Sequence, residues 1–430
     1  MSDFDFIVVG AGPAGSSAAI RLATAGSSVL LVERADPPGS KAVSGGILWG
    51  RDLDGLIPDW EKSAPVERYI DFKSTSFLTR DSKISIDFRS KKFEEKKTGY
   101  SVLRAKLDQF LALKAKAAGA TLVTGITVDS LARKENRIVG VVQDGDTITS
   151  DAVILAEGAN PRVAIESGLR EPLRDRDCAI GIKQIVKLSE ATVNERFNLT
   201  GNSGYAGEFA LGYLEGGVRA GGFLYTNKDS LSIGVVIAME NLRANGSTYS
   251  YDIMEKFMEH PYVKPLVEGG RVQEYSAHLV PEGGIDSMPK LFGDGYLIAG
   301  DSASMTFSNG MIIQGMNYAI ASGAMAADSL LEAAKKKDFS GAALSSYQDR
   351  LEHSQVLMDL RKFRGIDKVT WSRLVHEVAP GMMENILFSM FYEDGNPKKH
   401  LAEIILGSLS KANMKRSELI METYRMLRRM

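Results

Sequence analysis

The residues best placed to do chemistry lie at the start of the chain. Gly10, Gly12 and Gly15 form a G-x-G-x-x-G pattern directly after an apolar run of β-forming residues at 4–9. The first glycine permits a tight turn, the second allows the backbone to approach a pyrophosphate, and the third allows a helix to pack closely on the strand. The first turn of that helix then directs N–H groups and the positive end of its dipole at the phosphates.

Glu33 completes this pattern. A helix of small residues is expected from Ser16 to about Ala25, and an apolar strand at 28–32 then ends at Glu33. A carboxylate at this point can accept hydrogen bonds from an adenosine ribose. Strand, turn, helix, strand and acid all follow in register, so the sequence predicts a dinucleotide-binding unit. A structural glycine-rich turn alone would not explain the acid.

A second strand-to-glycine junction lies near residue 300. Residues 295–299 form a buried strand that ends in Gly300-Asp301, and a helix rich in Ala and Gly follows at 315–334. A carboxylate there can bond a ribityl hydroxyl, and the start of the helix can stabilise negative charge on a reduced isoalloxazine. NAD has no ribityl chain, so the junction favours FAD over NAD. The alternative is that Asp301 only caps a helix or turn.

The composition limits the remaining possibilities. The 430 residues predict two or three domains, with 44% hydrophobic and 25% charged residues as in ordinary globular proteins. Because 52 Lys and Arg nearly balance 54 Asp and Glu, the net charge is close to zero, and no overall positive potential favours binding of nucleic acid. Cys178 is the only cysteine, which excludes an intrachain disulfide, a zinc cluster and an all-cysteine iron–sulfur cluster, and no metal site is predicted. Neither a secretory signal nor a membrane span is expected, so a cytoplasmic protein is the simplest interpretation.

The order of patterns predicts an α/β fold in which a Rossmann-like FAD-binding domain is interrupted by a mostly antiparallel β substrate domain. Short β-runs separated by glycine or Asn-Lys-Asp turns between 179 and 238 predict the second sheet. A helical region follows at the C-terminus. The predicted parts are 1–75, 101–177 and 290–339 for FAD binding, 76–100 and 178–289 for the β substrate (quinone) domain, and 340–430 for the helices.

Several segments carry more specific expectations. Residues 82–88 alternate strictly and predict a half-buried strand, and residues 126–131 predict another strand. Residues 252–268 predict one helix, and residues 340–430 are expected to be helical throughout. The Met-rich span 382–392, with the basic tail after it, fits either a packed core helix or contact with an anionic membrane.

Arg104 stands at the start of a predicted helix, where a cation opposes the dipole unless an anion lies nearby. A phosphate of the cofactor would be such an anion. A solvated surface arginine is the alternative.

With these residues in view, the whole chain resembles FAD-dependent oxidoreductases of the p-hydroxybenzoate-hydroxylase fold. Within them it is most similar to FixC-type electron-transfer-flavoprotein–quinone oxidoreductases. The resemblance rests on the two glycine motifs and on the following stretches: Gly39-Ser40-Lys41-Ala42-Val43-Ser44-Gly45-Gly46, Tyr100-Ser101-Val102-Leu103-Arg104, Gly222-Phe223-Leu224-Tyr225-Thr226-Asn227, Ala277-His278-Leu279-Val280-Pro281-Glu282-Gly283-Gly284 and Leu357-Met358-Asp359-Leu360-Arg361.

The resemblance implies a set of site residues. It places Ser44 to Gly46 beside the flavin, Arg104 in the FAD site, and His278 to Gly284 at the quinone side. Together with the motifs above, the predicted cofactor-binding residues are Gly10, Gly12, Pro13, Ala14, Gly15, Glu33, Arg34, Lys41, Ser44, Gly45, Gly46, Arg104, Val128, Gly158, Gly300, Asp301, Gly315, Met316 and Asn317. His278 is the one catalytic candidate, as a proton shuttle to quinone, although a lone histidine is more often structural.

Two departures from relatives are informative. Single-chain mitochondrial relatives carry a cysteine-ligated iron–sulfur domain, which Cys178 alone cannot provide. The resemblance therefore implies a separate ferredoxin-like iron–sulfur subunit, besides an electron-transfer flavoprotein and a membrane quinone as partners, with peripheral contact at the inner face of the cell membrane. Glu157 stands where hydroxylases of this fold often have Asp, which weakens an NADPH contact there.

The expected function is transfer of electrons from an electron-transfer flavoprotein through FAD to a membrane quinone. A geranylgeranyl-reductase-like flavoprotein acting on isoprenoid double bonds is the main alternative, although its relatives usually have cysteine where this chain has residues 43–46. An aromatic hydroxylase, which would use NADPH and oxygen, is weaker. A flavin-bound assembly subunit with a docking role is the alternative of a different class.

Overall fold

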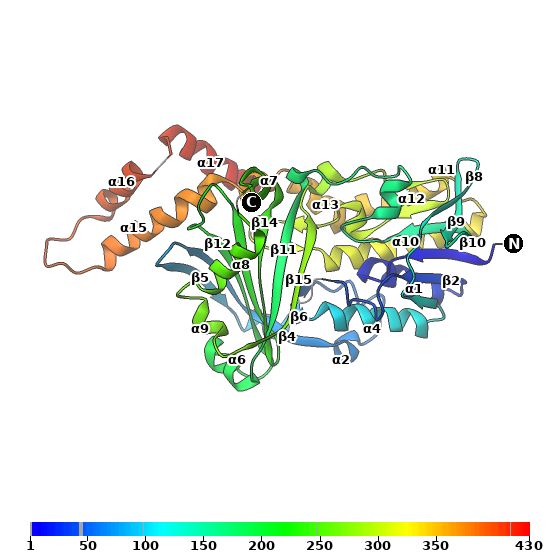
Figure 1. The fold of residues 1–430 in the computed structure, drawn as a ribbon, viewed down its shortest axis with the longest axis horizontal. Helices are drawn as coiled ribbons and strands as arrows, with labels where there is room; N and C mark the ends of the chain where they lie inside the picture. The colour runs from blue at the N-terminus through cyan, green and yellow to red at the C-terminus, as the bar shows by residue number, and fades with distance from the viewer. Residues whose placement is uncertain (1, 43–45, 98, 247, 413) are drawn as a thin grey trace.

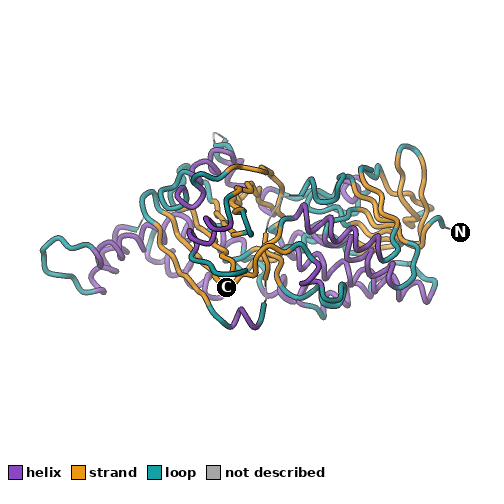
Figure 2. Tube along the Cα trace, turned by 90° about the horizontal axis from the view of Figure 1, so that it is seen from below, coloured by secondary structure: helices purple, strands orange, loops and turns teal. Residues whose placement is uncertain are grey.

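The computed structural model describes residues 2–42, 46–97, 99–246, 248–412 and 414–430. It is elongated, with the N-terminus at one end and helices α15 and α16 at the other (Figure 1). Two large sheets lie between these ends, and the helices gather mainly around the N-terminal sheet and at the opposite tip (Figure 2).

The first sheet has a parallel centre. Its strand order is β16-β17-β10-β1-β2-β7, and β8 and β9 continue from β10 as an antiparallel meander. Uninterrupted apolar runs form the central strands because both faces of a parallel sheet are covered. The strands are β1 (Phe4–Val9), β2 (Val29–Glu33), β7 (Thr121–Thr124), β8 (Ser130–Lys134), β9 (Arg137–Gln143), β10 (Asp146–Leu155), β16 (Phe292–Gly293) and β17 (Tyr296–Ile298).

Three helices pack around this sheet, namely α1 (Pro13–Thr24), α4 (Arg104–Ala117) and α10 (Met316–Lys336). Small residues allow α1 and α10 to touch: a Cβ on Gly323 would lie 2.0 Å from the backbone oxygen of Ala14. The core below them is aliphatic and includes Ile7, Leu31 and Leu155, all fully buried.

The second sheet is mostly antiparallel, in the order β15-β11-β14-β13-β12-β4-β6-β3 with β5 paired to β4. One face packs on α8 (Ser250–Met258), whose Phe257 meets Phe209. The strands are β3 (Gly46–Trp49), β4 (Val66–Leu78), β5 (Lys83–Arg89), β6 (Gly99–Val102), β11 (Cys178–Lys187), β12 (Ser203–Leu211), β13 (Ala220–Thr226), β14 (Ser230–Ala238) and β15 (Arg271–Pro281). Strands β3 and β4 thus belong to this sheet, although the sequence predicts that residues 1–75 bind FAD; the domain boundaries stay a prediction.

Shorter elements complete the fold. A two-stranded sheet of β18 (Phe307–Ser308) and β19 (Ile313–Gln314) precedes α10. The remaining α-helices are α2 (Trp60–Ser63), α3 (Lys92–Glu95), α5 (Arg162–Glu166), α6 (Glu190–Phe197), α7 (Met239–Ala244), α9 (Lys264–Val267), α11 (Gly341–Leu344), α12 (Ser346–Glu352), α13 (Gln355–Lys362), α14 (Asp367–Thr370), α15 (Ala379–Phe391), α16 (Leu401–Lys411) and α17 (Arg416–Arg429). A π-helical turn, Leu374–Val378, precedes α15.

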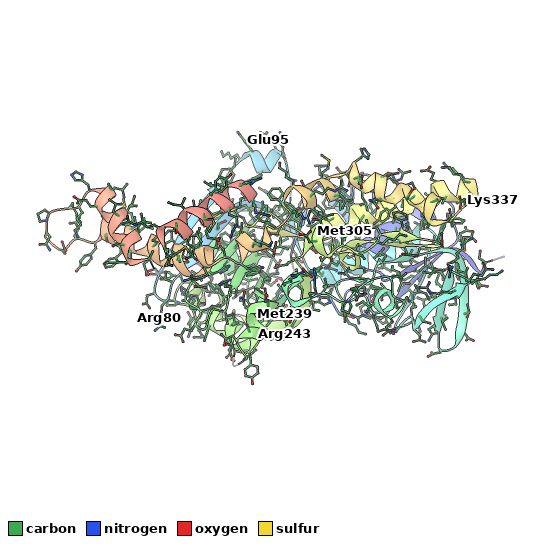
Figure 3. All side chains as sticks on the ribbon, turned by 90° about the horizontal axis from the view of Figure 1, so that it is seen from above. Arg80, Glu95, Met239, Arg243, Met305 and Lys337 are labelled. Atoms are coloured by element: carbon green, nitrogen blue, oxygen red, sulfur yellow. The ribbon has the colours of Figure 1, made fainter. Side chains whose placement is uncertain are left out.

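Helices α15 and α16 form what we call the C-terminal arm. It extends away from both sheets, whereas α17 returns to the body (Figure 1). Figure 3 shows Arg80, in the β4–β5 turn, on the arm's side of the molecule and Lys337, after α10, at the opposite end. The hydroxyls of Thr79 and Ser82 both donate to Glu384 of α15, so the arm is tied to that turn.

The arm contradicts the core-helix interpretation of residues 382–392. Pro380 is the buried residue of α15, whereas Phe388 and Phe391 are 63% and 75% exposed. The helical prediction for 340–430 is also interrupted, because residues 392–400 form a loop between α15 and α16.

Three further segments differ from expectation. Strand β5 is an edge strand that leaves Ile86 and Phe88 largely exposed rather than half-buried. Residues 126–129 are not a strand, because β8 begins only at Ser130. The helix expected at 252–268 divides into α8 and α9 around Pro261, since proline cannot donate to a continuing helix.

Candidate functional site

One cavity of about 950 Å³ lies between the two sheets. On one side it is lined by the segments that follow β1, β2, β10 and β17, which all end at the same edge of the first sheet. On the other side it is lined by β3, β12, β13 and β15 of the second sheet. A ligand at this edge would meet the loops that parallel strands present at their carboxyl ends.

The glycine turn is shaped by close backbone contacts. Gly10 has φ +100°, and a Cβ there would lie 2.3 Å from the backbone oxygen of Ala156. A Cβ on Gly15 would lie 1.8 Å from the Gly10 oxygen, which shows how closely α1 returns to the turn. Gly12 is the N-cap of α1 and has no neighbour within 4 Å of a built Cβ. Its open side lines the cavity, so a phosphate can approach the helix N-terminus.

Glu33 braces this turn and faces the cavity. Its two carboxylate oxygens each accept one backbone hydrogen bond, from Ala11 N–H and Ala35 N–H, both at 2.8 Å. A carboxylate has about four acceptor positions, so capacity remains for ligand hydroxyls. The arrangement fits the expected contact with an adenosine ribose.

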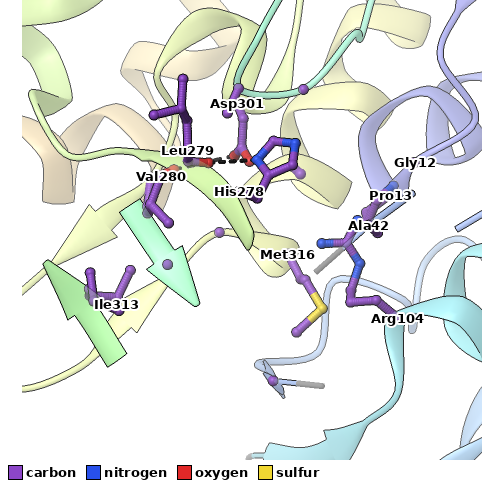
Figure 4. A pocket seen from close by; sticks show the side chains of 18 of the residues that line it. Gly12, Pro13, Ala42, Arg104, His278, Leu279, Val280, Asp301, Ile313 and Met316 are labelled. Carbon is purple, nitrogen blue, oxygen red and sulfur yellow. Dashed lines mark hydrogen bonds between the residues drawn. The ribbon is translucent and has the colours of Figure 1, made fainter. Parts of the chain in front are cut away.

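Arg104 is held in place by its own helix. Its Nε and Nη2 donate to the Asp108 carboxylate at 2.8 and 2.7 Å, and Arg104 lines the cavity. The side chain reaches from α4 toward Pro13 (Figure 4). Arg104 is therefore a paired cation at the cavity rather than a solvated surface arginine, and a guanidinium fixed in this way can still donate to a phosphate.

Asp301 and His278 both line the cavity, and their side chains lie next to each other (Figure 4). Burial raises the pKa of Asp301, while Arg104 and a hydrogen bond from the Thr306 hydroxyl, at 3.2 Å, act in the opposite direction. Nδ1 of His278 donates to the Leu279 backbone oxygen at 2.7 Å. In the neutral imidazole its Nε2 is then the acceptor, which leaves that atom able to take up a proton.

The structure places most of the predicted site residues around this one cavity. The cavity is lined by Gly10, Gly12, Pro13, Ala14, Glu33, Arg34, Lys41, Gly46, Arg104, Val128, Gly158, Asp301, Gly315, Met316 and, as the catalytic candidate, His278. Gly15, Gly300 and Asn317 do not line the cavity. Gly15 packs against the turn at Gly10, Gly300 packs against Ala14 at the end of β17, and Asn317 is buried in α10. Ser44 and Gly45 lie outside the described residues.

The second sheet contributes residues that are not among the predicted site residues. Trp49, Phe77, Phe223 and Tyr225 give this end of the cavity an aromatic lining, with Glu208 among them. These side chains are brought together only by the pairing of their strands. In the sequence, the one indication was that Glu208 is a charged residue within an apolar β-run.

Two glutamates close to the cavity have structural roles that the sequence did not reveal. Glu157 accepts hydrogen bonds from Val163 N–H at 2.8 Å and Ala164 N–H at 3.0 Å, so it caps α5. Glu282 accepts a hydrogen bond from the Trp371 indole at 2.6 Å, and its other oxygen is buried without a partner among the described residues. Burial raises the pKa of Glu282 to about 7.

The cavity meets the requirements of FAD. It joins the open N-terminus of α1, the carboxylate at the end of β2 and a second carboxylate before α10, all on continuous lining. Among the described residues no group of three or more His, Cys, Asp or Glu is arranged to hold a metal ion. In the same part of the chain no helix is long and apolar enough to cross a membrane. Fold and site define an FAD-dependent oxidoreductase.

Comparison with known proteins gives the family. Residues 4–220 match the pyridine nucleotide-disulphide oxidoreductase family model. The chain is 39% identical to a probable electron transfer flavoprotein-quinone oxidoreductase, YdiS, of Escherichia coli over 96% of this chain and 97% of that protein. It is 40% identical to FixC of Escherichia coli K12, over 94% of each chain, and 36% identical to FixC of Azorhizobium caulinodans, over 92% of each. The chain belongs to the FixC family of electron-transfer-flavoprotein–quinone oxidoreductases.

Solved structures support the fold. A geranylgeranyl bacteriochlorophyll reductase-like protein from Thermoplasma acidophilum aligns with a TM-score of 0.71 over 98% of this chain and 99% of its own, at 19% identity. The flavin-dependent brominase Bmp2 aligns with a TM-score of 0.63 over 95% of this chain and 98% of its own, at 17% identity. At such identities the similarity concerns the fold alone.

Proposed function

We propose that the protein takes electrons from an electron-transfer flavoprotein onto FAD and passes them to a membrane quinone. The observation that carries this proposal is the continuity of the cavity. It runs from the glycine turn to an aromatic sheet face, where the lining includes the largely exposed Ile86 of edge strand β5. A flavin and an apolar quinone can therefore share one continuous cavity that opens at Ile86.

FAD would be held by the residues that line the nucleotide side. The open backbone at Gly12 would receive the pyrophosphate, Glu33 the adenosine ribose, and Asp301 the ribityl chain. The start of α10 at Met316 would face the isoalloxazine, and Arg104 would donate to a phosphate. When bound, FAD supplies the two-electron redox chemistry, and these residues orient it and set the charge around it.

On the quinone side, His278 would accept or return a proton through Nε2, since Nδ1 is already committed to the Leu279 oxygen. The flanking aromatic residues would exclude water from the quinone ring. Quinone reduction consumes protons, so a positioned acid is needed besides the electron donor.

The C-terminal arm supports contact with a bilayer. Phe388, Phe391 and Leu406 are 63%, 75% and 58% exposed, and the same segment exposes both basic residues, Lys399 and Lys411, and acidic ones, Glu393, Asp394 and Glu403. Exposed aromatic and aliphatic side chains on a helix favour insertion into the surface of a membrane. Because Thr79 and Ser82 tie the arm to the turn before β5, this surface continues to the exposed Ile86 at the cavity.

This contact can be tested with vesicles. The F388S/F391S variant should float less with vesicles containing phosphatidylglycerol than the unmodified protein does. Y249S removes an aromatic side chain that is 72% exposed on the body, and it should float as before. Equal flotation of all three proteins would exclude the arm from membrane contact.

We also propose a separate iron–sulfur subunit. Cys178 is the only cysteine and is buried, so the chain itself offers no cluster ligands. Affinity purification from the native cell, followed by iron and sulfide analysis, would identify a ferredoxin-like companion and the flavoprotein donor. A preparation with full donor-to-quinone activity and no iron would exclude that subunit.

The first experiment uses the purified FAD-loaded protein. It is reduced without oxygen and mixed with a short-chain quinone or, separately, with a geranylgeranyl lipid, while the return of oxidised flavin absorbance is recorded. Fast reoxidation by quinone alone supports the proposal. Reoxidation only by the lipid, with loss of a double bond, would instead assign an isoprenoid reductase.

A further inference from the structure

The second sheet presents one ordered row of side chains to the cavity. The register pairs Thr75 of β4 with Glu208 of β12, and Glu208 with Phe223 of β13. Directly paired residues of neighbouring strands point to the same face. All three line the cavity, so this face of the sheet is the cavity wall. Of the lining residues that the structure describes, Glu208 is the one carboxylate that this sheet provides.

Glu208 is paired on one side only. Its Oε1 accepts a hydrogen bond from Lys73 Nζ at 3.1 Å, whereas its Oε2 is buried with no hydrogen-bond partner in the described part of the chain. Lys73 also lies 4.8 Å from the centroid of the Trp49 ring, which fixes the ammonium by a cation–π contact. The side chains of Glu208 and Lys73 are 16% and 22% exposed, so the pair is mostly desolvated but not sealed.

Burial raises the pKa of Glu208, although Lys73 and the Tyr225 side chain act in the opposite direction. A carboxyl group whose pKa is raised toward the working pH can serve as a proton donor. An unsatisfied buried acceptor costs about 1–3 kcal/mol, so Oε2 is an open position for a hydrogen-bonding group of a ligand.

We propose that Glu208 donates a proton to a carbonyl oxygen of the bound quinone and that Lys73 stabilises the resulting carboxylate and returns the proton from solvent. This inference rests on the proposed quinone function. Two electrons come from the reduced cofactor, the proton that the cofactor releases reaches the quinone through His278, and the second proton comes from Glu208. The carboxyl O–H bond breaks, the quinone carbonyl π bond opens, and a new O–H bond forms on each quinone oxygen, which gives hydroquinone.

The test compares two electron acceptors on the same reduced, FAD-loaded protein. A short-chain quinone needs protons, whereas ferricenium accepts single electrons and needs none. The Glu208→Gln variant should reoxidise with quinone about 100-fold more slowly or worse, as expected for loss of a general acid. Its rate with ferricenium should equal that of the unmodified protein. The solvent deuterium isotope effect on the quinone reaction should also change in this variant.

Two further variants keep the test decisive. Glu215→Gln alters a glutamate whose side chain is 79% exposed and should react as the unmodified protein with both acceptors. Lys73→Met keeps the carboxyl but removes its cation, and should also slow the quinone reaction selectively. Lys73→Met therefore provides the test if the Glu208→Gln variant does not fold or does not retain FAD.

The outcomes separate this inference from the function on which it rests. If the unmodified protein is not reoxidised by quinone, the proposed function fails. If it is, and Glu208→Gln matches it with quinone, the proton-donor role is refuted. Equal slowing with quinone and ferricenium would also refute it, because the variant would then disturb the flavin rather than proton delivery.

Discussion

Glu282 gives the clearest quantitative prediction, through the Glu282→Gln variant. The carboxyl group is buried against the Trp371 indole, and burial raises its pKa from 4.5 to about 7. As pH rises, this carboxyl group ionises in the unfolded chain before it ionises in the folded protein. The free energy of unfolding therefore falls between about pH 4.5 and about pH 7. The 2.5-unit difference corresponds to about 3 kcal/mol in full, and to about 2.5 kcal/mol between pH 5 and pH 8.5.

Glutamine keeps an acceptor for the Trp371 indole but cannot ionise. The variant should therefore gain about 2.5 kcal/mol relative to the unmodified protein between pH 5 and pH 8.5. Urea unfolding of both proteins, followed by circular dichroism across this range, measures the difference. Asp52, whose pKa burial raises to about 6, contributes equally to both proteins and cancels. Glu215→Gln is the control at an exposed site. Parallel pH dependences of Glu282→Gln and the unmodified protein would refute the reasoning.

Three other predictions concern the nucleotide side and the lone thiol. Gly323→Ala should destabilise the protein by about 1–3 kcal/mol and weaken FAD retention, because its Cβ would press on the Ala14 oxygen; unchanged thermal denaturation and FAD content would contradict this. Glu33→Ala removes the acceptor of the Ala11 N–H and a ribose partner, so FAD affinity measured by fluorescence titration should fall at least about tenfold, and an unaltered Kd would count against the contact. Burial raises the pKa of Cys178 to about 11, so a thiol reagent at pH 8 should label it only after unfolding, and prompt labelling of the native protein would be inconsistent with this environment.

The predicted nucleotide-binding segment could be recognised because the residue patterns that identify it are local in the sequence. The turn at Gly10, the helix from Pro13 and the acid at Glu33 follow one another within a short segment, and each residue type has one strong backbone or hydrogen-bonding reason. The structure places all three at the same edge of the first sheet.

The half of the cavity that the second sheet lines could not be predicted in the same way. Glu208 faces the cavity only because β12 pairs with β4 in one register, and a shift by one residue would turn it to the opposite face. No residue pattern near Glu208 in the sequence identifies which residues of β4 are its partners. The exposure of the C-terminal arm could not be predicted for another reason. The hydropathy of Phe388 and Phe391 is the same whether they pack in a core, contact a lipid surface or bind a partner.

The connectivity of the first sheet has a consequence for synthesis on the ribosome. Strand β1 emerges first, but its neighbour β10 follows only at Asp146–Leu155 and the outer β17 only at Tyr296–Ile298. Met316, at the start of α10, comes later still. The nascent chain therefore carries the glycine turn and its apolar strands for most of translation without the partners that cover them. Such delayed pairing favours slow folding and exposure to aggregation until α10, Met316–Lys336, has been made.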